Sequence, residues 1–517
     1  MAPGNSGNAG MTAIPLMIDQ ISWSATSWVA VLVVLVTSLV VKLLWSAEAN
    51  LPPGPTPIPL LGNLLMFQGK IARLHNYCLK LSKKYGDPMT VYFGNKPCVV
   101  VSNYELAKEI YQQNVFCSRQ DSPTMELMLQ GGHDIVMSKY GLQWQFHKKA
   151  ASRCMRPIIE SEQLIERVSW AIDFVVEQML ARNGTVQPGI FMRNAVYNII
   201  GSMAFGKTYK VDDPVFLHLH HLVEEGNEQF IKMVALDLLP FARYLPLKMF
   251  SPVRKIVAAT KELKAYVDTQ INERWRTYSR DHIRDYCDAM FCELEMSYSN
   301  DRHTERLSEE DMRWIIFDFF NAGTDTTSVV LTWLVLFLTI HQDIQEECYA
   351  AIEQVVGDRR PCMSDRVALP LIDACISETL RLRPPMPLGF GMPMPHAAVT
   401  DANIGKYRIP KDTMIMANFH AIHTDPEHWK NPLDFDPKLH FIGEDGGIKK
   451  PTSFMPFGIG RRSCLGEQLA RKELFLATVR LLQKMKLESV PGEMYNDPDA
   501  DLFAAARSFS VKVVPRK

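Results

Sequence analysis

The sequence predicts a mainly α-helical protein with small β-sheets, in which one body follows an N-terminal transmembrane helix. Most of the chain has the apolar periodicity of amphipathic helices. One stretch, Thr90 to Ser102, has the β-branched and aromatic content of a short hairpin, with a turn near Gly94-Asn95-Lys96. A third stretch, Ile21 to Leu44, is apolar over most of its length. Together these observations define the expected fold class.

The composition excludes several classes of protein. The 517 residues are 47% hydrophobic and 22% charged, which are ordinary globular values. With 56 Lys+Arg against 57 Asp+Glu, the net charge is -1, so no basic excess exists to bind a nucleic-acid backbone. The ten cysteines show no C-x-x-C spacing, which argues against a disulfide scaffold and a structural zinc site.

The N-terminal apolar stretch has the features of a signal anchor. Its 24 residues, 21–44, exceed the roughly 20 that span a bilayer, and tryptophans lie towards its ends. The first basic residue of the chain is Lys42, so the positive-inside rule places the following body in the cytosol. A cleaved signal peptide is the alternative, but it carries positive charge before its apolar core. We expect a leader and anchor in residues 1–49, with one membrane pass.

A proline-rich segment separates the anchor from the body. Residues 51–59 contain five prolines, which hold the backbone in an extended, semi-rigid conformation. Residues 50–60 are therefore expected to be a spacer, and residues 61–517 to form the body. A linker with no further role is equally compatible with these residues.

The longest predicted helix, Thr304 to Asp343, carries an acid in its buried middle. The segment Trp314 to Gly323 is apolar nearly all round, which predicts burial through the body. Asp325 and Thr326 follow, and a buried carboxylate is costly unless it is paired or functional. A threonine hydroxyl bonding back to a carbonyl beside Gly323 would open the helical ladder and make space for dioxygen or water. A capped helix start is the alternative, which the apolar turns before this site disfavour.

A glycine-punctuated loop, Phe454 to Gly466, precedes a predicted helix from Glu467 to Lys484. Cys464 lies at the junction, where backbone N–H groups favour a thiolate over a thiol. The glycines at 458, 460 and 466 let the backbone approach the sulfur and leave room for a flat ligand. These are the needs of a sulfur that ligates haem iron. A nucleophilic cysteine and a buried inert one remain open at this point.

Three motifs, in this order and spacing, resemble the cytochrome P450 superfamily of haem-thiolate monooxygenases. The pattern F-x-x-G-x-R-x-C-x-G is matched by Phe457, Gly460, Arg462, Cys464 and Gly466; A-G-x-[DE]-T by Ala322, Gly323, Asp325 and Thr326; E-x-x-R by Glu378 and Arg381. Further segments resemble the animal microsomal clan that contains drug-metabolising enzymes and steroid 17-alpha-hydroxylases. These segments are Trp144 to Lys148, Pro395-His396, Asp425-Pro426 and the C-terminal third. Fungal microsomal enzymes share much of these segments.

The resemblance implies a role for each matched residue. Haem b would be bound through Cys464 as the axial thiolate, within a loop that Phe457 and Gly466 shape. Trp144, Lys148 and Arg462 would meet the haem propionates. Asp325 and Thr326 would deliver protons for dioxygen chemistry, and Glu378 with Arg381 would lock the core beneath the haem.

Two positions depart from the family's pattern. Lys148 stands where an arginine is usual, so a bidentate propionate contact becomes a point-charge contact. In the pattern F-x-P-x-R, Leu439 takes the place of the arginine that completes the Glu-Arg-Arg cluster. Neighbouring His440 can substitute, as histidine does in some relatives, and the sequence leaves the choice between Leu439 and His440 open.

The resemblance also implies how the protein works in the cell. Because the motifs must converge on one macrocycle, residues 61–517 would form a single haem domain, on the cytosolic side of the endoplasmic reticulum membrane. No G-x-G-x-x-G fingerprint occurs, so electrons from NADPH would arrive through a cytochrome reductase, with cytochrome b5 as an optional second donor. A basic docking face would contain Lys148, Lys149, Arg153, Arg471 and Lys472. Residues 238–247 would contact membrane lipid.

A lipophilic substrate is expected, with a weak preference for a steroid or another rigid polycycle over a xenobiotic or secondary metabolite. Its pocket would be bounded by Phe319, Phe320, Ala322, residues 385–390 and Phe503, which offer apolar surface and almost no charge. Three alternatives remain: a haem-thiolate isomerase or dehydratase, a non-catalytic membrane-anchored haem protein, and a cysteine hydrolase. The acid and threonine at 325 and 326 count against the first.

Overall fold

The computed structural model describes residues 28–37, 50–68, 70, 73–129, 133–182, 184–237, 246, 250–299, 306–390, 395–493, 495 and 508–516. Contacts divide the chain into two compact units, Met1–Ala49 and Asn50–Lys517. The described part of the first unit is the apolar helix Trp28–Thr37, which lies within the expected membrane span. The rest of that span lies outside the described residues, as do Phe503 and nearly all of the expected lipid-contact segment 238–247.

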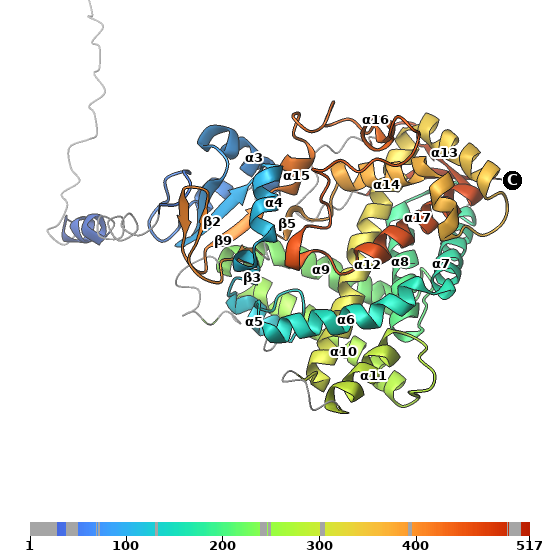
Figure 1. Ribbon diagram of the computed structural model, residues 1–517, viewed down its shortest axis with the longest axis horizontal. Helices are drawn as coiled ribbons and strands as arrows, with labels where there is room; N and C mark the ends of the chain where they lie inside the picture. Colours follow the sequence, from blue (N-terminus) through green and yellow to red (C-terminus); the bar gives the residue numbers. More distant parts are fainter. Residues whose placement is uncertain are drawn as a thin grey trace, which may run out of the picture. The chain divides into compact units, whose positions relative to one another are not determined.

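The second unit is mainly helical, as the sequence predicts (Figure 1). Its α-helices are α2 (Leu64–Phe67), α3 (Leu74–Tyr85), α4 (Tyr104–Gln112), α5 (Pro123–Leu129), α6 (Leu142–Glu160), α7 (Glu162–Leu180), α8 (Pro188–Phe205), α9 (Pro214–Asp237), α10 (Ser251–Trp275), α11 (Tyr286–Ser299), α12 (Glu309–Ile340), α13 (Gln342–Val355), α14 (Pro370–Leu382), α15 (Phe419–His423), α16 (Pro437–Phe441) and α17 (Glu467–Lys484). The bounds of α17 are those predicted from the sequence.

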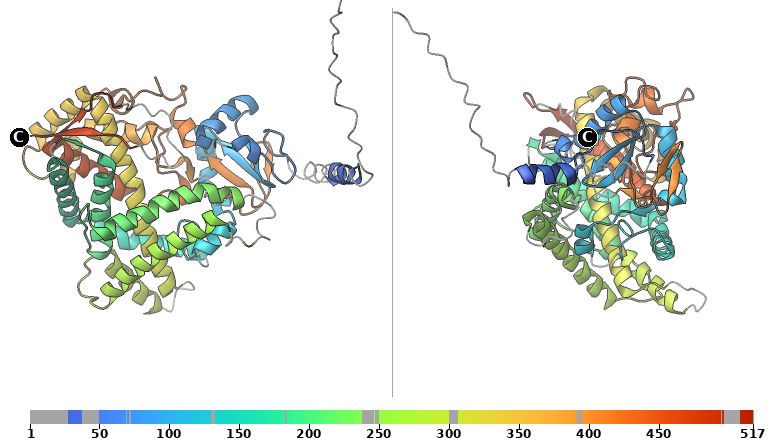
Figure 2. Two further views of the ribbon diagram at one scale, coloured as in Figure 1. Left: turned by 180° about the vertical axis from the view of Figure 1, so that it is seen from behind. Right: turned by 90° about the vertical axis from the view of Figure 1, so that its left-hand side faces the viewer.

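Helix α12 passes through the core of the second unit, between α8, α10 and α17 (Figures 1 and 2). It begins where Ser308 and Asp311 form a capping box, in which the Ser308 hydroxyl accepts a hydrogen bond from the Asp311 amide at 3.1 Å. Trp314, Phe317 and Leu334 are buried along it. Among the described residues, α12 is the helix long and apolar enough to cross a membrane, and its burial makes it a core helix instead.

Three small sheets complete the unit. The largest has the strand order β1-β2-β9-β6-β3, the second β10-β11-β4 and the third β7-β8. The strands are β1 (Met89–Phe93), β2 (Lys96–Val101), β3 (Ser118–Arg119), β4 (Thr185–Val186), β5 (Pro387–Phe390), β6 (His396–Ala397), β7 (Ala402–Ile404), β8 (Tyr407–Ile409), β9 (Met414–Ala417), β10 (Met485–Ser489) and β11 (Val511–Pro515). Strands β1 and β2 form the predicted hairpin, whose turn holds Gly94 at φ +63°.

Candidate functional site

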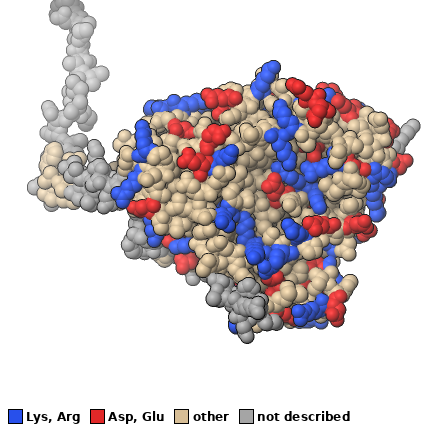
Figure 3. Space-filling model, in the orientation of Figure 1, with Lys and Arg blue, Asp and Glu red and all other residues tan. Residues whose placement is uncertain are grey.

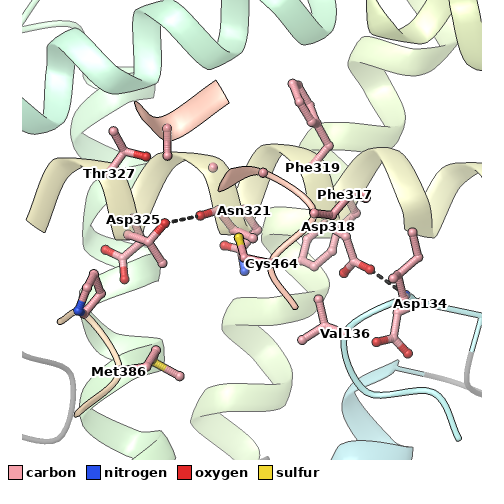
Figure 4. Close-up of a pocket in the computed structure, with 18 of the residues that line it drawn as sticks. Asp134, Val136, Phe317, Asp318, Phe319, Asn321, Asp325, Thr327, Met386 and Cys464 are labelled. Atoms are coloured by element: carbon pink, nitrogen blue, oxygen red, sulfur yellow. Dashed lines mark hydrogen bonds between the residues drawn. The ribbon is translucent and has the colours of Figure 1, made fainter. Parts of the chain in front are cut away.

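A cavity of about 450 Å³ lies between α12 and the cysteine loop (Figure 4). Eight of the predicted site residues line it, although they come from distant parts of the chain: Trp144, Lys148, Asp325, Thr326, Phe457, Arg462, Cys464 and Gly466. The other two predicted residues, Glu378 and Arg381, are absent from this wall and are fully buried on α14. The fold therefore brings the cysteine motif and the acid–threonine motif to one space.

The cysteine loop owes its shape to two glycines and one hydrogen bond. Gly458 and Gly460 have φ angles of +70° and +77°, and a Cβ at Gly460 would lie only 1.8 Å from the Tyr111 carbonyl oxygen. The Cys464 amide donates to the Phe457 carbonyl at 2.9 Å, which closes the loop before α17. These contacts hold the sulfur at the cavity wall.

The protonation of Cys464 differs from the sequence-based expectation. Burial raises the pKa of the Cys464 thiol, and this outweighs the hydrogen bond from the Gly466 amide and the nearby Lys148 ammonium, which both act to lower it. Position at a helix start is therefore not sufficient to produce a thiolate here. A metal cation bound at the sulfur would remove the proton.

Three cations and an indole gather at one end of the cavity wall: Arg119, Trp144, Lys148 and Arg462. The Arg462 guanidinium lies 4.0 Å from the centroid of the Trp144 ring, and it donates to the Ser138 carbonyl at 2.6 Å. Lys148 donates to the Ser463 carbonyl at 3.0 Å. These contacts bind the loop before α6 and the cysteine loop to each other.

Burial makes the positive charge of all three cations costly. Burial first, and Arg462 second, lower the pKa of Lys148 to about 8; burial and Arg119 lower that of Arg462 to about 9. Burial also lowers the pKa of Arg119 to about 10. Two carboxyl groups, Asp134 and Asp318, also line the wall, and burial raises the pKa of each. Such a cluster fits an anionic ligand, and the two carboxylates of haem match it.

The acid–threonine motif lines the opposite side of the cavity, on α12. The Thr326 hydroxyl donates to the Ala322 carbonyl at 2.8 Å, the back-bonding predicted from the sequence. The helix is continuous from Glu309 to Ile340, so the structure shows this bond without the predicted interruption of the helix. The Asp325 carboxylate accepts a hydrogen bond from the Asn227 amide at 3.2 Å and lies 3.8 Å from Arg193.

The third member of the buried Glu-Arg cluster is His440. Both side chains of the ion pair are fully buried, and the Arg381 Nε donates to Glu378 at 2.7 Å. The His440 Nδ1 lies 2.9 Å from the Glu378 carboxylate, and its Nε2 lies 2.6 Å from the Lys430 carbonyl oxygen. Both ring nitrogens therefore have an acceptor within hydrogen-bond distance. His440 thus makes the contact with Glu378 that Leu439 cannot.

The structure places one expected pocket residue elsewhere, and several residues of the cavity wall were not predicted from the sequence. Phe319, Ala322, Pro385 and Met386 line the cavity, but Phe320 packs in the core, 5.3 Å from the Phe205 ring, so its expected place on the wall is wrong. The wall also contains charged residues that the sequence analysis did not single out: Arg119, Asp134, Asp318 and Glu473. Helical spacing places residue 318 on the face of Ala322 and Asp325, a signal that could have revealed it.

Residues 52–513 match the family model for cytochrome P450. The chain belongs to the cytochrome P450 family. Cytochrome P450 2C28 of Mesocricetus auratus is 32% identical over 508 residues, which cover 94% of this chain and 99% of the relative. Steroid 17-alpha-hydroxylase/17,20 lyase of Squalus acanthias is 30% identical over 491 residues, covering 91% and 93%. Cytochrome P450 1A1 of Chelon auratus is 30% identical over 490 residues, covering 90% and 91%.

Membership of this family establishes the reaction class. This cytochrome P450 is a haem-dependent monooxygenase that binds haem b and takes electrons from NADPH through a partner reductase. Its substrates are lipophilic, and its location is the endoplasmic reticulum membrane.

Proposed function

We propose that Cys464 would ligate the haem iron and that Trp144, Lys148, Arg462 and Arg119 would hold the haem carboxylates. Bound haem supplies the activation of dioxygen, of which one atom enters the substrate and the other leaves as water. The observation that carries the proposal is the shared cavity, whose wall contains both Cys464 with the buried cations and the Ala322–Thr326 turn of α12. Thiolate ligation should red-shift the Soret band of the ferrous carbonyl, and Cys464→Ala should abolish that shift.

Asp325 and Thr326 would move protons into this cavity. Thr326 is exposed to the cavity although it lies in a core helix, and its hydroxyl is held by the Ala322 carbonyl. Asp325 has one carboxylate oxygen near Asn227 and the other near Arg193, which orients it at the same wall. In this arrangement Asp325 takes up a proton and the Thr326 hydroxyl passes one towards the centre of the cavity.

Replacing the threonine tests this role. Thr326→Ala should retain haem and consume NADPH while releasing more peroxide, because a positioned proton donor is typically worth about 10²–10⁴-fold in rate. Product formed per NADPH would be measured, with Thr332→Ala as a matched control. Thr332 makes the same bond to a carbonyl at 2.7 Å, but it is absent from the cavity wall. An unchanged product yield in Thr326→Ala would contradict the role.

The favoured substrate is a rigid, mainly apolar molecule of steroid or polycyclic size, hydroxylated at carbon. Ile200, Val223 and Ile315 on the wall would bind it by burial of apolar surface, worth roughly 25 cal/mol per Å². Asp134 and Asp318 interrupt this surface and favour a substrate with one polar group. One relative named a steroid hydroxylase supports the steroid preference. Steroids, polycyclic aromatics and fatty acids would be compared by haem spectral shift and product formation. Turnover of fatty acids alone would contradict the preference for a rigid polycyclic substrate.

The membrane topology is part of the same proposal. Residues 1–49 would form a leader and single-pass anchor, residues 50–60 a spacer, and residues 61–517 a cytosolic haem domain that also contacts lipid. The apolar helix Trp28–Thr37 supports the anchor. Lys and Arg side chains gather over α6 in Figure 3 and support a docking face for the reductase, with cytochrome b5 as a second donor. Removing residues 1–49 should leave haem binding and catalysis with detergent-supplied reductase intact.

A further inference from the structure

Three residues on one face of α8 lie along the acid–threonine turn of α12. Arg193, Tyr197 and Ile200 follow the i, i+4, i+7 spacing, so their side chains leave α8 on the same side. The Arg193 guanidinium lies 3.8 Å from the Asp325 carboxylate. A Cβ added at Gly323 would lie 3.0 Å from the Ile200 Cδ1 atom, so this end of the face also touches the turn. Tyr197 therefore stands between two contacts with the turn.

The Tyr197 ring is fully buried and is fixed by two edge-to-face contacts. Its centroid lies 5.5 Å from that of Phe216 on α9, with an interplanar angle of 79°, and 5.7 Å from that of Phe320 on α12, with an angle of 85°. Phe320 lies one helical turn before Thr324, and the Tyr197 hydroxyl lies beside the Thr324 hydroxyl. These contacts depend on the ring alone. They aim the hydroxyl at the turn without using it.

The Tyr197 hydroxyl is an unused hydrogen-bond donor. Among the residues that the structure describes, none forms a hydrogen bond with it, and the neighbouring Thr324 hydroxyl donates to the Asn321 carbonyl at 3.2 Å instead. Burial raises the pKa of Tyr197, and the nearby Asp325 carboxylate raises it further, so the phenol keeps its proton. A buried donor without an acceptor is costly, and an acceptor that moved to it would lower the free energy.

The Asp325 carboxylate is the acceptor with room for a further donor. Its Oδ2 accepts from the Asn227 amide at 3.2 Å, whereas its Oδ1 has the Arg193 guanidinium at 3.8 Å, an ion pair longer than a hydrogen bond. Arg193 is also shared with α9, where it lies 3.0 Å from the His220 Nδ1 atom and 4.0 Å from Glu224. A loosely held carboxylate oxygen and an unused phenol thus face the same turn from two helices.

We propose that Tyr197 is a positioning residue for Asp325, whose carboxylate accepts a hydrogen bond from the Tyr197 hydroxyl when it turns away from Arg193. The inference rests on the proposed proton transfer by Asp325 and Thr326. When Asp325 gives its proton to the Thr326 hydroxyl, a carboxylate forms, and a donor beside it stabilises that charge. The phenol keeps its own proton throughout. Tyr197 thus favours proton release by Asp325 without itself meeting the substrate.

Tyr197→Phe removes the hydroxyl and keeps the ring contacts. Because the hydroxyl has no partner in this arrangement, the free energy of unfolding in urea should be unchanged or higher. The pH at which the Asp325 carboxyl takes up a proton should rise by about one unit, as expected for the loss of one charge-assisted hydrogen bond. Infrared spectra of the full-length ferric haem protein with ¹³C-labelled aspartate would measure it without turnover. The band that Asp325→Asn removes identifies the group.

Tyr209→Phe is the matched control. The Tyr209 hydroxyl contacts that of Tyr266 on α10, so its loss should leave the Asp325 titration unchanged. In turnover, product formed per NADPH should fall by up to about tenfold in Tyr197→Phe, because Asp325 would hold its proton more tightly. In the Asp325→Asn background the same substitution should have no further effect, since it acts through the carboxylate.

Three results would overturn the role of Tyr197. They are an unchanged Asp325 titration in Tyr197→Phe, an equal loss of product with and without the Asp325 carboxylate, and a lower free energy of unfolding, which would make the hydroxyl a structural group. The infrared titration does not depend on proton delivery. An unchanged product yield in Thr326→Ala would therefore argue against the proposed function and leave the test of the Tyr197–Asp325 contact valid.

Discussion

Two buried clusters of charge lie close to the cysteine loop, and they differ in how their charge is balanced. The floor cluster consists of Glu378, Arg381 and His440, whose polar groups find partners within the protein. Arg381 donates to the Glu378 carboxylate and to three backbone carbonyls, and His440 contacts the same carboxylate and a fourth backbone carbonyl. Burial alone would raise the pKa of Glu378, but hydrogen bonds from Arg381 and His440 hold it below its usual range. This cluster needs nothing from outside the chain.

In the wall cluster, Arg119, Lys148 and Arg462, neighbouring negative groups do not outweigh the effect of burial on the pKa values. All three pKa values are lowered, because burial penalises each charge. Repulsion by neighbouring cations lowers the pKa values of Lys148 and Arg462 further. The floor cluster is complete within the protein. In the haem-binding role that we propose, the wall cluster would gain the negative charge of its ligand.

The largest expected effect comes from breaking the floor cluster. Glu378→Gln would leave the Arg381 guanidinium buried without a counter-charge, which costs about 3–5 kcal/mol of the free energy of unfolding. Urea denaturation would measure it, with Glu347→Gln as the control. Glu347 pairs with Lys438 on the surface, so its loss should cost about 1 kcal/mol or less. Equal effects of the two substitutions would show that the floor cluster is not self-contained.

His440 offers a sharper test of the same cluster. His440→Leu would remove a charged hydrogen bond to Glu378 and should cost about 1.5–3 kcal/mol of the free energy of unfolding. His440→Arg would keep a hydrogen-bond donor to Glu378 at this position and should retain more of the stability. If leucine and arginine were equivalent there by urea denaturation, the role of His440 as a donor to Glu378 would be wrong.

Substitutions in the wall cluster should affect haem retention more than the free energy of unfolding. Arg462→Gln would lose one charge-assisted contact to a haem carboxylate and should speed transfer of haem to excess apomyoglobin by about tenfold. Its effect on the free energy of unfolding of the haem-free protein should be much smaller than that of Glu378→Gln, since two repelling cations remain instead of three. The opposite ranking of these two effects would remove the distinction between the clusters.

The smallest expected effect is a pH dependence of haem retention. The pKa of Lys148 is about 8 in the haem-free structure, and an anion beside it would raise that value. Haem binding would then take up a proton, so affinity should fall as the pH rises from about 8 towards the ordinary lysine value. Haem transfer measured across this range would show the slope. In Lys148→Arg, which stays charged throughout, the slope should disappear.

Local patterns allowed the sequence by itself to determine a large part of this protein. The β1–β2 hairpin, the burial of α12, the bounds of α17 and the back-bonding of Thr326 depend on residues near in the chain, and the structure has each of them. The motif around Cys464 identified the family, because its glycines and cysteine lie within one loop.

Only the tertiary structure decided which charges meet and how far they are buried. His440 completes the floor cluster through a contact across 62 residues of sequence, and Arg119 reaches the wall from a two-residue strand. Phe320 faces the core although its neighbour Phe319 lines the cavity. The raised pKa of Cys464 likewise depends on burial. Desolvation and pairing depend on the whole surrounding structure, and for that reason no local pattern in the chain contains them.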